Sequence, residues 1–145
     1  RVGDGSTEGP VHVVTCFLRR GGRILVLKRS MEVRTNRGRW AGVSGYVEPG
    51  ETPRETAYKE LGEEISATPE QLELVREAPP LTFLDDEHDT TWVVHPFLFD
   101  DRGVEVVLDW EHTEHAWIPP RQLGSLDTVV GLERTLDAAL GVVRE

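Results

Sequence analysis

Three glutamates are spaced so that a helix would bring them together. Glu60, Glu63 and Glu64 stand at i, i+3 and i+4, so their carboxylates would lie within one helical turn. Like charges at this spacing repel by about 0.2–0.5 kcal/mol per pair. A cluster of hard oxygen donors suits Mg²⁺ or Mn²⁺, which would neutralise that repulsion. The triplet therefore indicates either a divalent metal site or a solvated acidic helix face.

The residues before the triplet predict where its helix begins. Thr52, Pro53 and Glu55 form a capping box with proline at the first helical position. The apolar residues that follow at i, i+4 and i+8 are Ala57, Leu61 and Ile65. This stripe should face a core, with the glutamates beside it. Upstream, residues 40–47 read as a strand that ends in a loop containing glycine.

Residues 45–67 resemble the Nudix box, the signature G-x5-E-x7-R-E-U-x-E-E-x-G-U in which U is aliphatic. The matching residues are Gly45, Glu51, Glu60, Leu61, Glu63 and Glu64. Three positions depart from the pattern: Lys59 replaces arginine, Ser66 replaces glycine and Ala67 replaces the last aliphatic residue. The pairs Gly38-x-Trp40 and Glu114-x-x-Trp117 also resemble the family, so the similarity extends over most of residues 11–140.

The resemblance implies an α/β fold, a Nudix-type α/β/α sandwich with a mixed β-sheet between helices. It also implies Mg²⁺ or Mn²⁺ as cofactor, bound by Glu60, Glu63, Glu64 and the backbone carbonyl of Gly45. The family pairs the residues that match Glu51 and Lys59 to orient the glutamates. Lysine keeps the positive charge at this position but lacks the two-pronged geometry of arginine.

The catalytic residues implied are Glu60, Glu63 and Glu114. The general base of the family is either the box glutamate matching Glu60 or an acidic residue of a later loop. Glu111 and Glu114 fall in such a region, beside His112 and His115, which could equally form a polar loop.

Substrate contacts are expected from residues just before the box. Arg37 and Arg39 could bind phosphates, because guanidinium groups pair well with them, or could lie in a solvated basic loop. Trp40 could stack on a base or belong to the core. The acidic run 85–89 reads as a solvated turn that could carry an additional divalent ion.

The expected reaction is hydrolysis of a pyrophosphate bond in a nucleoside diphosphate linked to another group. We expect ADP-ribose or another nucleotide sugar ahead of nucleoside triphosphates. The alternative is a non-catalytic nucleotide-sensing Nudix domain, fused in a longer chain to a module like translation initiation factor 2B. The departures at Lys59 and Ser66 and an Arg1 start motivate this alternative.

The composition of the chain argues against several other classes of protein. The net charge of −10 argues against a nucleic-acid surface, and no apolar run is long enough to span a membrane. Cys16 is the single cysteine, in an apolar segment, so we expect a core residue, no intrachain disulfide and a cytoplasmic protein. A homodimer is compatible with the sequence.

Residues 1–10 are expected to form a flexible tail and residues 11–145 a single domain, either complete or part of a longer protein. The predicted strands are 11–18, 23–28, 40–47, 72–76, 81–84, 91–99, 103–108 and 115–118. A second helix is predicted over residues 125–140, with Val129, Leu132, Leu136 and Leu140 as its apolar stripe and Gly141 as its C-terminal cap.

Overall fold

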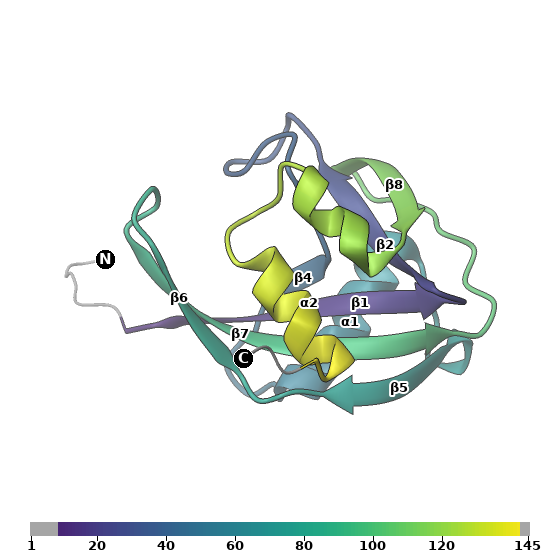
Figure 1. Cartoon of the computed structure of the whole chain (residues 1–145). Helices are drawn as coiled ribbons and strands as arrows, with labels where there is room; N and C mark the ends of the chain where they lie inside the picture. Colours follow the sequence, from purple (N-terminus) through teal and green to yellow (C-terminus); the bar gives the residue numbers. More distant parts are fainter. Residues whose placement is uncertain (1–8, 143–145) are drawn as a thin grey trace.

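The computed structural model describes residues 9–142, so residues 1–8 of the expected tail lie outside it (Figure 1). The strands are β1 (Val11–Arg20), β2 (Arg23–Arg29), β3 (Trp40–Ala41), β4 (Val43–Tyr46), β5 (Leu72–Glu77), β6 (Leu81–Asp85), β7 (Thr90–Asp101) and β8 (His112–Ile118). The helices are α1 (Pro53–Ile65) and α2 (Leu132–Leu140), with 3-10 turns at Pro69–Gln71 and Pro120–Ser125.

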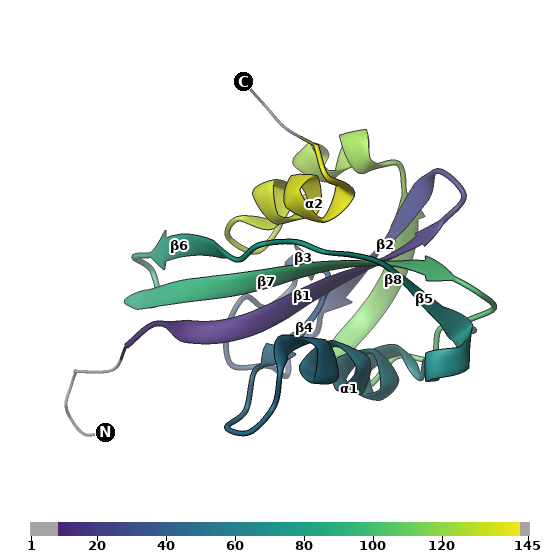
Figure 2. The same ribbon diagram turned by 90° about the horizontal axis from the view of Figure 1, so that it is seen from below.

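The strands form one mixed sheet, as predicted. Its main order is β3-β2-β1-β7-β5, and β4, β6 and β8 pair with β1, β7 and β2 respectively. The central pair β1 and β7 is parallel, and the other pairs of strands are antiparallel. Figure 2 shows α1 on one face of this sheet and α2 on the other. The molecule is therefore an α/β/α sandwich.

The predicted strand 40–47 is divided at Gly42. Its first part, β3, pairs with β2, whereas its second part, β4, pairs with β1. A Cβ atom at position 42 would lie 2.9 Å from Thr15 Cγ2 and 3.0 Å from the carbonyl oxygen of Cys16. Glycine is needed because the chain crosses tightly over β1 as it changes partner.

Each face of the sheet carries its own hydrophobic cluster. Beneath α1, Leu61 and Ile65 pack with Phe97 and Phe99 of β7. Beneath α2, Leu132 and Leu136 pack with Phe17 and Leu98. Neighbouring residues of β7 point to opposite faces, as side chains of a strand do: Phe97 and Phe99 enter one cluster and Leu98 the other. Cys16 is buried in the first cluster, as expected.

Two predicted elements differ from the structure. Residues 103–108 form no strand, because the amides of Val107 and Asp109 donate to the Ile65 and Glu64 carbonyls at the end of α1. The second helix begins at Leu132 and not at residue 125. Gly131 adopts a left-handed conformation there, with φ 77°, and the preceding segment is held as a loop by the hydrogen bond from the Val129 amide to the Trp40 carbonyl.

The start and end of α1 match the sequence closely. The Thr52 side chain accepts from the Glu55 amide, and the Glu55 carboxylate accepts from the Thr52 amide, so the capping box is complete. The helix ends at Ser66, which adopts a left-handed conformation with φ 64°. Such a conformation strains residues other than glycine. Within residues 9–142, no helix is long and apolar enough to cross a membrane.

Candidate active site

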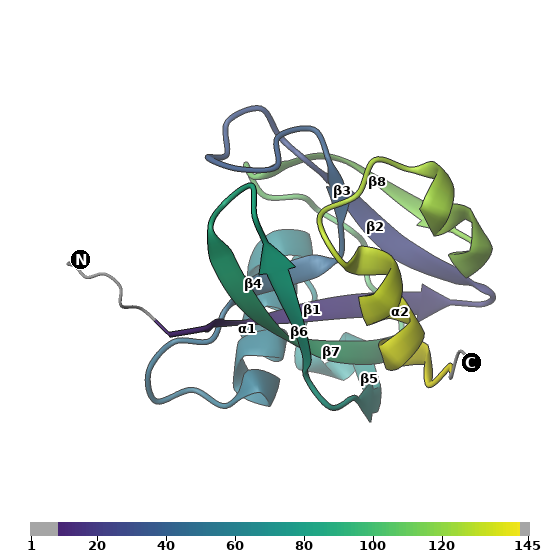
Figure 3. The ribbon, with the colours of Figure 1, turned by 60° about the vertical axis from the view of Figure 1, so that its left-hand side comes forward.

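A pocket of about 370 Å³ opens beside the C-terminal part of β4 and the glutamates of α1. One side of its lining, which we call the acidic wall, consists of Glu48, Glu60, Glu63, Glu64 and Glu111. The other side, which we call the aromatic wall, consists of Tyr46, Phe83, Asp85, Trp92, Val129 and Val130. Figure 3 shows the segments that carry the aromatic wall, the hairpin β6–β7 and the loop before α2, close to each other.

Gly45 brings the backbone of β4 against the carboxylate of Glu60. A Cβ atom at position 45 would lie 2.2 Å from Glu60 Cδ and 2.5 Å from its Oε2. No other residue type could occupy this position without displacing the carboxylate. The structure thus brings Gly45 and Glu60 together, as the Nudix resemblance predicts for the metal ligands.

Burial and mutual repulsion raise the pKa values of Glu60 and Glu64. Burial raises the pKa of Glu64 well above its usual 4.5, and the hydrogen bond to Glu60 and that group's charge add to this effect. Burial also raises the pKa of Glu60. Without a cation between them, the two carboxyl groups therefore bind a proton more tightly than isolated carboxyl groups do, and the effect is larger for Glu64.

Glu64 also has a free coordination position. Its Oε1 is buried and accepts no hydrogen bond. The nearest polar partner in an ion-pair contact is His112 Nε2 at 3.7 Å, too far for a hydrogen bond. His112 is itself oriented by a 2.8 Å contact from its Nδ1 to Asp109 Oδ1. A buried, unpartnered carboxylate oxygen beside further carboxylates fits a Mg²⁺ or Mn²⁺ ion well.

Lys59 and Glu51 pair in the way the resemblance predicts. Lys59 Nζ lies 2.7 Å from Glu51 Oε2, and the hydroxyl of Thr56 donates to Glu51 Oε1 at 2.8 Å. These contacts, with the bond from the Glu48 amide, lower the pKa of Glu51 to about 2. Glu51 therefore ties the loop before α1 to the second turn of the helix, on the side of the glutamate cluster.

Of the two glutamates in the later loop that could act as the general base, one lines the pocket and the other does not. Glu111 lines the pocket, and its negative charge contributes to the raised pKa values of Glu60 and Glu64. Glu114 lies on β8 with a side chain that is 59% exposed, 3.7 Å from Lys28 Nζ, and is not among the lining residues. The fold thus brings Glu111, and not Glu114, to the acidic wall.

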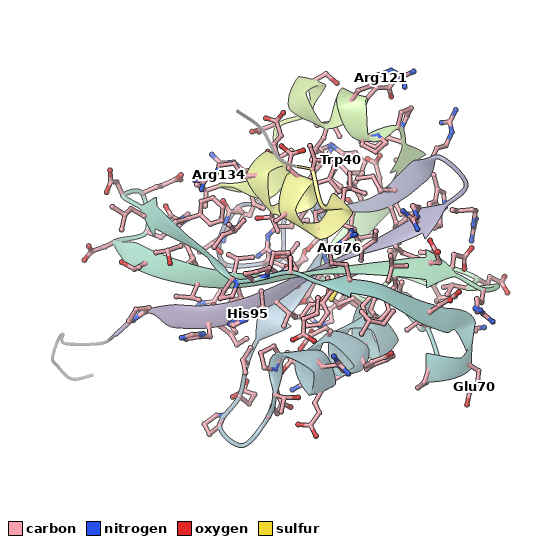
Figure 4. The ribbon with its side chains drawn as sticks, turned by 60° about the horizontal axis from the view of Figure 1, so that its bottom comes forward. Trp40, Glu70, Arg76, His95, Arg121 and Arg134 are labelled. Atoms are coloured by element: carbon pink, nitrogen blue, oxygen red, sulfur yellow. The ribbon has the colours of Figure 1, made fainter. Side chains whose placement is uncertain are left out.

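The predicted substrate-binding residues lie around the pocket and not on its lining. Arg37 donates to the Val33 carbonyl, and Arg39 lies between Glu87 and Asp127 at 3.5 and 3.7 Å. Trp40 packs against the cluster beneath α2, and Figure 4 shows it on that side of the sheet. Their binding roles stay predictions. Among the described residues that line the pocket, the cationic side chain is Arg29, which sequence reasoning did not single out.

The aromatic wall was not foreseen as part of the site. Its residues come from three segments distant in sequence: β4, the hairpin β6–β7 and the loop before α2. They are joined by the pairing of β6 with β7, the stacking of Tyr46 on Trp92 and the docking of the loop before α2. Of the acidic run 85–89, residues 86–89 form the expected turn, whereas Asp85 is the buried last residue of β6 and is not solvated. Asp85, Glu87 and His88 are close enough to share a cation. However, the Asp85 carboxylate is already held by His88 and Trp92.

Comparison with known proteins gives a consistent picture. A profile of the NUDIX domain matches residues 9–139. The nucleoside triphosphatase NudI of Escherichia coli K12 is 31% identical over 134 residues, which cover 86% of this chain and 92% of NudI. A MutT protein from Methanosarcina mazei Go1 superposes with a TM-score of 0.74 at 26% identity, covering 91% of this chain and 94% of that one. The dihydroneopterin triphosphate pyrophosphohydrolase of E. coli shares the fold, with a TM-score of 0.73 at 21% identity over 87% of this chain and 92% of that one.

The sandwich fold, with an acidic helix lining a pocket, defines an enzyme that hydrolyses phosphoric anhydrides. The chain belongs to the Nudix family and is a Nudix pyrophosphohydrolase.

Proposed function

We propose that this protein hydrolyses a pyrophosphate bond of a nucleotide with the help of Mg²⁺ or Mn²⁺, in the pocket beside α1. The observation that carries the proposal is the buried Oε1 of Glu64, which has no partner although it lies in a cluster of carboxylates. Leaving such a group unpaired is costly. A cation bound there would compensate the cost, and Glu60, Glu63, Glu64 and the Gly45 carbonyl are the groups that would hold it.

The bound cation would polarise the phosphoryl oxygens and offset the charge that develops on the leaving phosphate. The remaining tasks fall to side chains of the pocket. Arg29 would bind a phosphate oxygen; its Nε and Nη2 now donate to the Thr35 carbonyl at 3.1 and 3.0 Å. Glu111 would accept the proton of the attacking water, because it lines the pocket and is only partly buried, so a water molecule can reach its carboxylate.

The substrate would be a nucleoside diphosphate linked to another group. We place nucleoside triphosphates first, in which that group is the third phosphate, because the relative NudI is named a nucleoside triphosphatase. ADP-ribose and nucleotide sugars, which the sequence alone favoured, come second. In both cases the scissile bond lies between phosphates, next to the acidic wall, and the nucleoside extends along the pocket.

The test is release of phosphate or pyrophosphate from a panel of nucleoside triphosphates, ADP-ribose and nucleotide sugars, with Mg²⁺, with Mn²⁺ and with chelator. Loss of a group that only supports a metal ligand costs about 10- to 100-fold. Glu64→Gln should therefore reduce kcat/KM by at least about that factor. Glu105→Gln, an exposed glutamate outside the pocket lining, is the matched control and should retain full activity.

A second pair of variants separates the two candidates for the base. Glu111→Gln should lower kcat by about 100-fold or more, as expected for loss of a general base, and Glu114→Gln should leave it almost unchanged. The reverse result would restore Glu114 to the catalytic set. If no nucleotide is turned over although nucleotides bind, the catalytic proposal fails and the regulatory alternative is favoured.

A further inference from the structure

The aromatic wall contains one acidic group whose position the hydrolysis of phosphates does not explain. Asp85 is only 7% exposed, although it borders a pocket. It is the one acidic side chain that the hairpin β6–β7 contributes to the described lining; the others come from α1, the loop before it and the segment before β8.

The carboxylate of Asp85 is held firmly in place. Its Oδ2 accepts from Trp92 Nε1 at 3.0 Å and contacts His88 Nδ1 at 2.8 Å. Its Oδ1 accepts a hydrogen bond only from the amide of His88, at 3.3 Å. Burial raises the pKa of Asp85, but the bonds from Trp92 and His88 outweigh this and keep the pKa below its usual value. At neutral pH the group is an acceptor with spare capacity on Oδ1.

A short path of contacts connects Asp85 with the acidic wall. Gly45 lies against Glu60, and the next residue, Tyr46, stacks on Trp92 with ring centroids 6.3 Å apart. Trp92 in turn donates to Asp85. A nucleotide with its phosphates at the glutamates would therefore place its base among these aromatic rings, where a flat π-system is stabilised by stacking.

We propose that Asp85 is a specificity-determining residue that accepts a hydrogen bond from the exocyclic amino group of the base. This inference rests on the proposed hydrolysis of nucleotides. A carboxylate pairs well with the amino group of adenine, cytosine or guanine. In uracil and thymine the N–H group lies between two carbonyl oxygens, which would face the carboxylate and be repelled. The pocket would thus favour bases that carry an amino group.

The experiment compares kcat/KM for ATP, CTP, UTP and dTTP in the wild type and in Asp85→Asn. The amide keeps the shape and can still accept from Trp92, but it also offers a donor to a carbonyl oxygen of the base. We expect the ratio of CTP to UTP to fall by about tenfold in Asp85→Asn, within the range for one good side chain–base contact. Asp86→Asn, an exposed neighbour in the same turn, should leave the ratio unchanged.

Binding of CMP and UMP, measured by calorimetry, distinguishes the two proposals. If hydrolysis occurs but the ratio of CTP to UTP is the same in wild type and Asp85→Asn, the role of Asp85 is refuted and the proposed function stands. If no triphosphate is hydrolysed but Asp85→Asn narrows the preference for CMP over UMP, the role of Asp85 stands and the proposed function is refuted. If the wild type neither hydrolyses nor binds these nucleotides, both proposals are wrong.

Discussion

The two faces of the sheet serve different purposes. On the face of α1, the helix buries Leu61 and Ile65 but also Glu64, whose Oε1 is the one buried side-chain atom without a partner among those described. The cluster beneath α2 is apolar, and the buried Thr135 of that helix donates its hydroxyl to the Gly131 carbonyl. Helix α1 therefore carries the electrostatic cost of a buried carboxylate, whereas α2 contributes packing without such a cost.

The largest effect on stability should come from the face of α2. Leu136→Ala truncates a buried side chain in the cluster beneath α2 and should lower the free energy of unfolding by about 2–5 kcal/mol. Chemical denaturation measures this loss. At temperatures where the variant is folded, kcat should stay near the wild-type value. Leu61→Ala, in the cluster beneath α1, should lose similar stability but also much of its activity. If Leu61→Ala and Leu136→Ala were equally active, the proposed difference between the two faces of the sheet would be wrong.

The buried charge on the face of α1 should make stability depend on pH. Because the pKa of Glu64 is raised in the folded protein, its carboxyl binds a proton more tightly there than in the unfolded chain. This contribution to stability is complete below the unfolded value of 4.5 and is lost as the pH rises through the raised pKa. Relative to Glu64→Gln, the wild type should therefore become less stable as the pH rises from mildly acidic to neutral.

Thermal unfolding at several pH values measures this difference. Addition of Mg²⁺ at neutral pH should restore the stability of the wild type but have little effect on Glu64→Gln, because the cation binds only the folded protein. Glu105→Gln should follow the wild type throughout. Equal responses of the wild type and Glu64→Gln to Mg²⁺ would place the cation elsewhere.

The two helices also differ at their N-cap residues, which offers a test with a smaller expected effect. The N-cap of α1 is Thr52, which exchanges reciprocal bonds with Glu55, whereas the N-cap of α2 is Gly131, which has no capping side chain. Thr52→Ala should lower the free energy of unfolding by about 1 kcal/mol. Thr52→Ser keeps the hydroxyl and should recover most of this loss in the same denaturation experiment. A loss equally large in Thr52→Ser would indicate packing and not capping.

The end of α1 should give the smallest effect. Ser66 holds a left-handed conformation, and its hydroxyl donates to the Val107 carbonyl at 3.3 Å. Ser66→Gly relieves strain of about 1–2 kcal/mol but loses this weak bond and makes the unfolded chain more flexible, so a net gain of about 0.5 kcal/mol is expected. Ser66→Ala, which keeps the strain and loses the bond, should instead be destabilised.

The structure matches the sequence best where the determinants are local. The start of α1 follows from the side chain of Thr52 and the ring of Pro53, and its orientation follows from the spacing of Ala57, Leu61 and Ile65. These residues interact within a few positions of one another, so a single sequence suffices to place the helix and the glutamates that it carries.

Predictions failed where long-range contacts decide the outcome. In the predicted strand 103–108, Val104, Val106 and Leu108 do pack against the cluster beneath α1, but the backbone there is bonded to the end of α1 and not to a strand. The stripe of the second helix continues back to Val129, but the bond of that residue with Trp40 keeps it out of the helix. Asp85 and Val129 enter the site only through the pairing of distant segments, which no local pattern records.

The contact of Gly131 with Phe83 has a consequence for the order in which the enzyme is assembled. A Cβ atom at position 131 would lie 2.5 Å from Cε1 of Phe83, so the turn before α2 closes directly onto the aromatic wall. The residues of the acidic wall end at Glu111, so Val129 and Val130 are the last part of the pocket lining to be synthesised. The pocket is therefore complete only once the turn before α2 has closed onto Phe83.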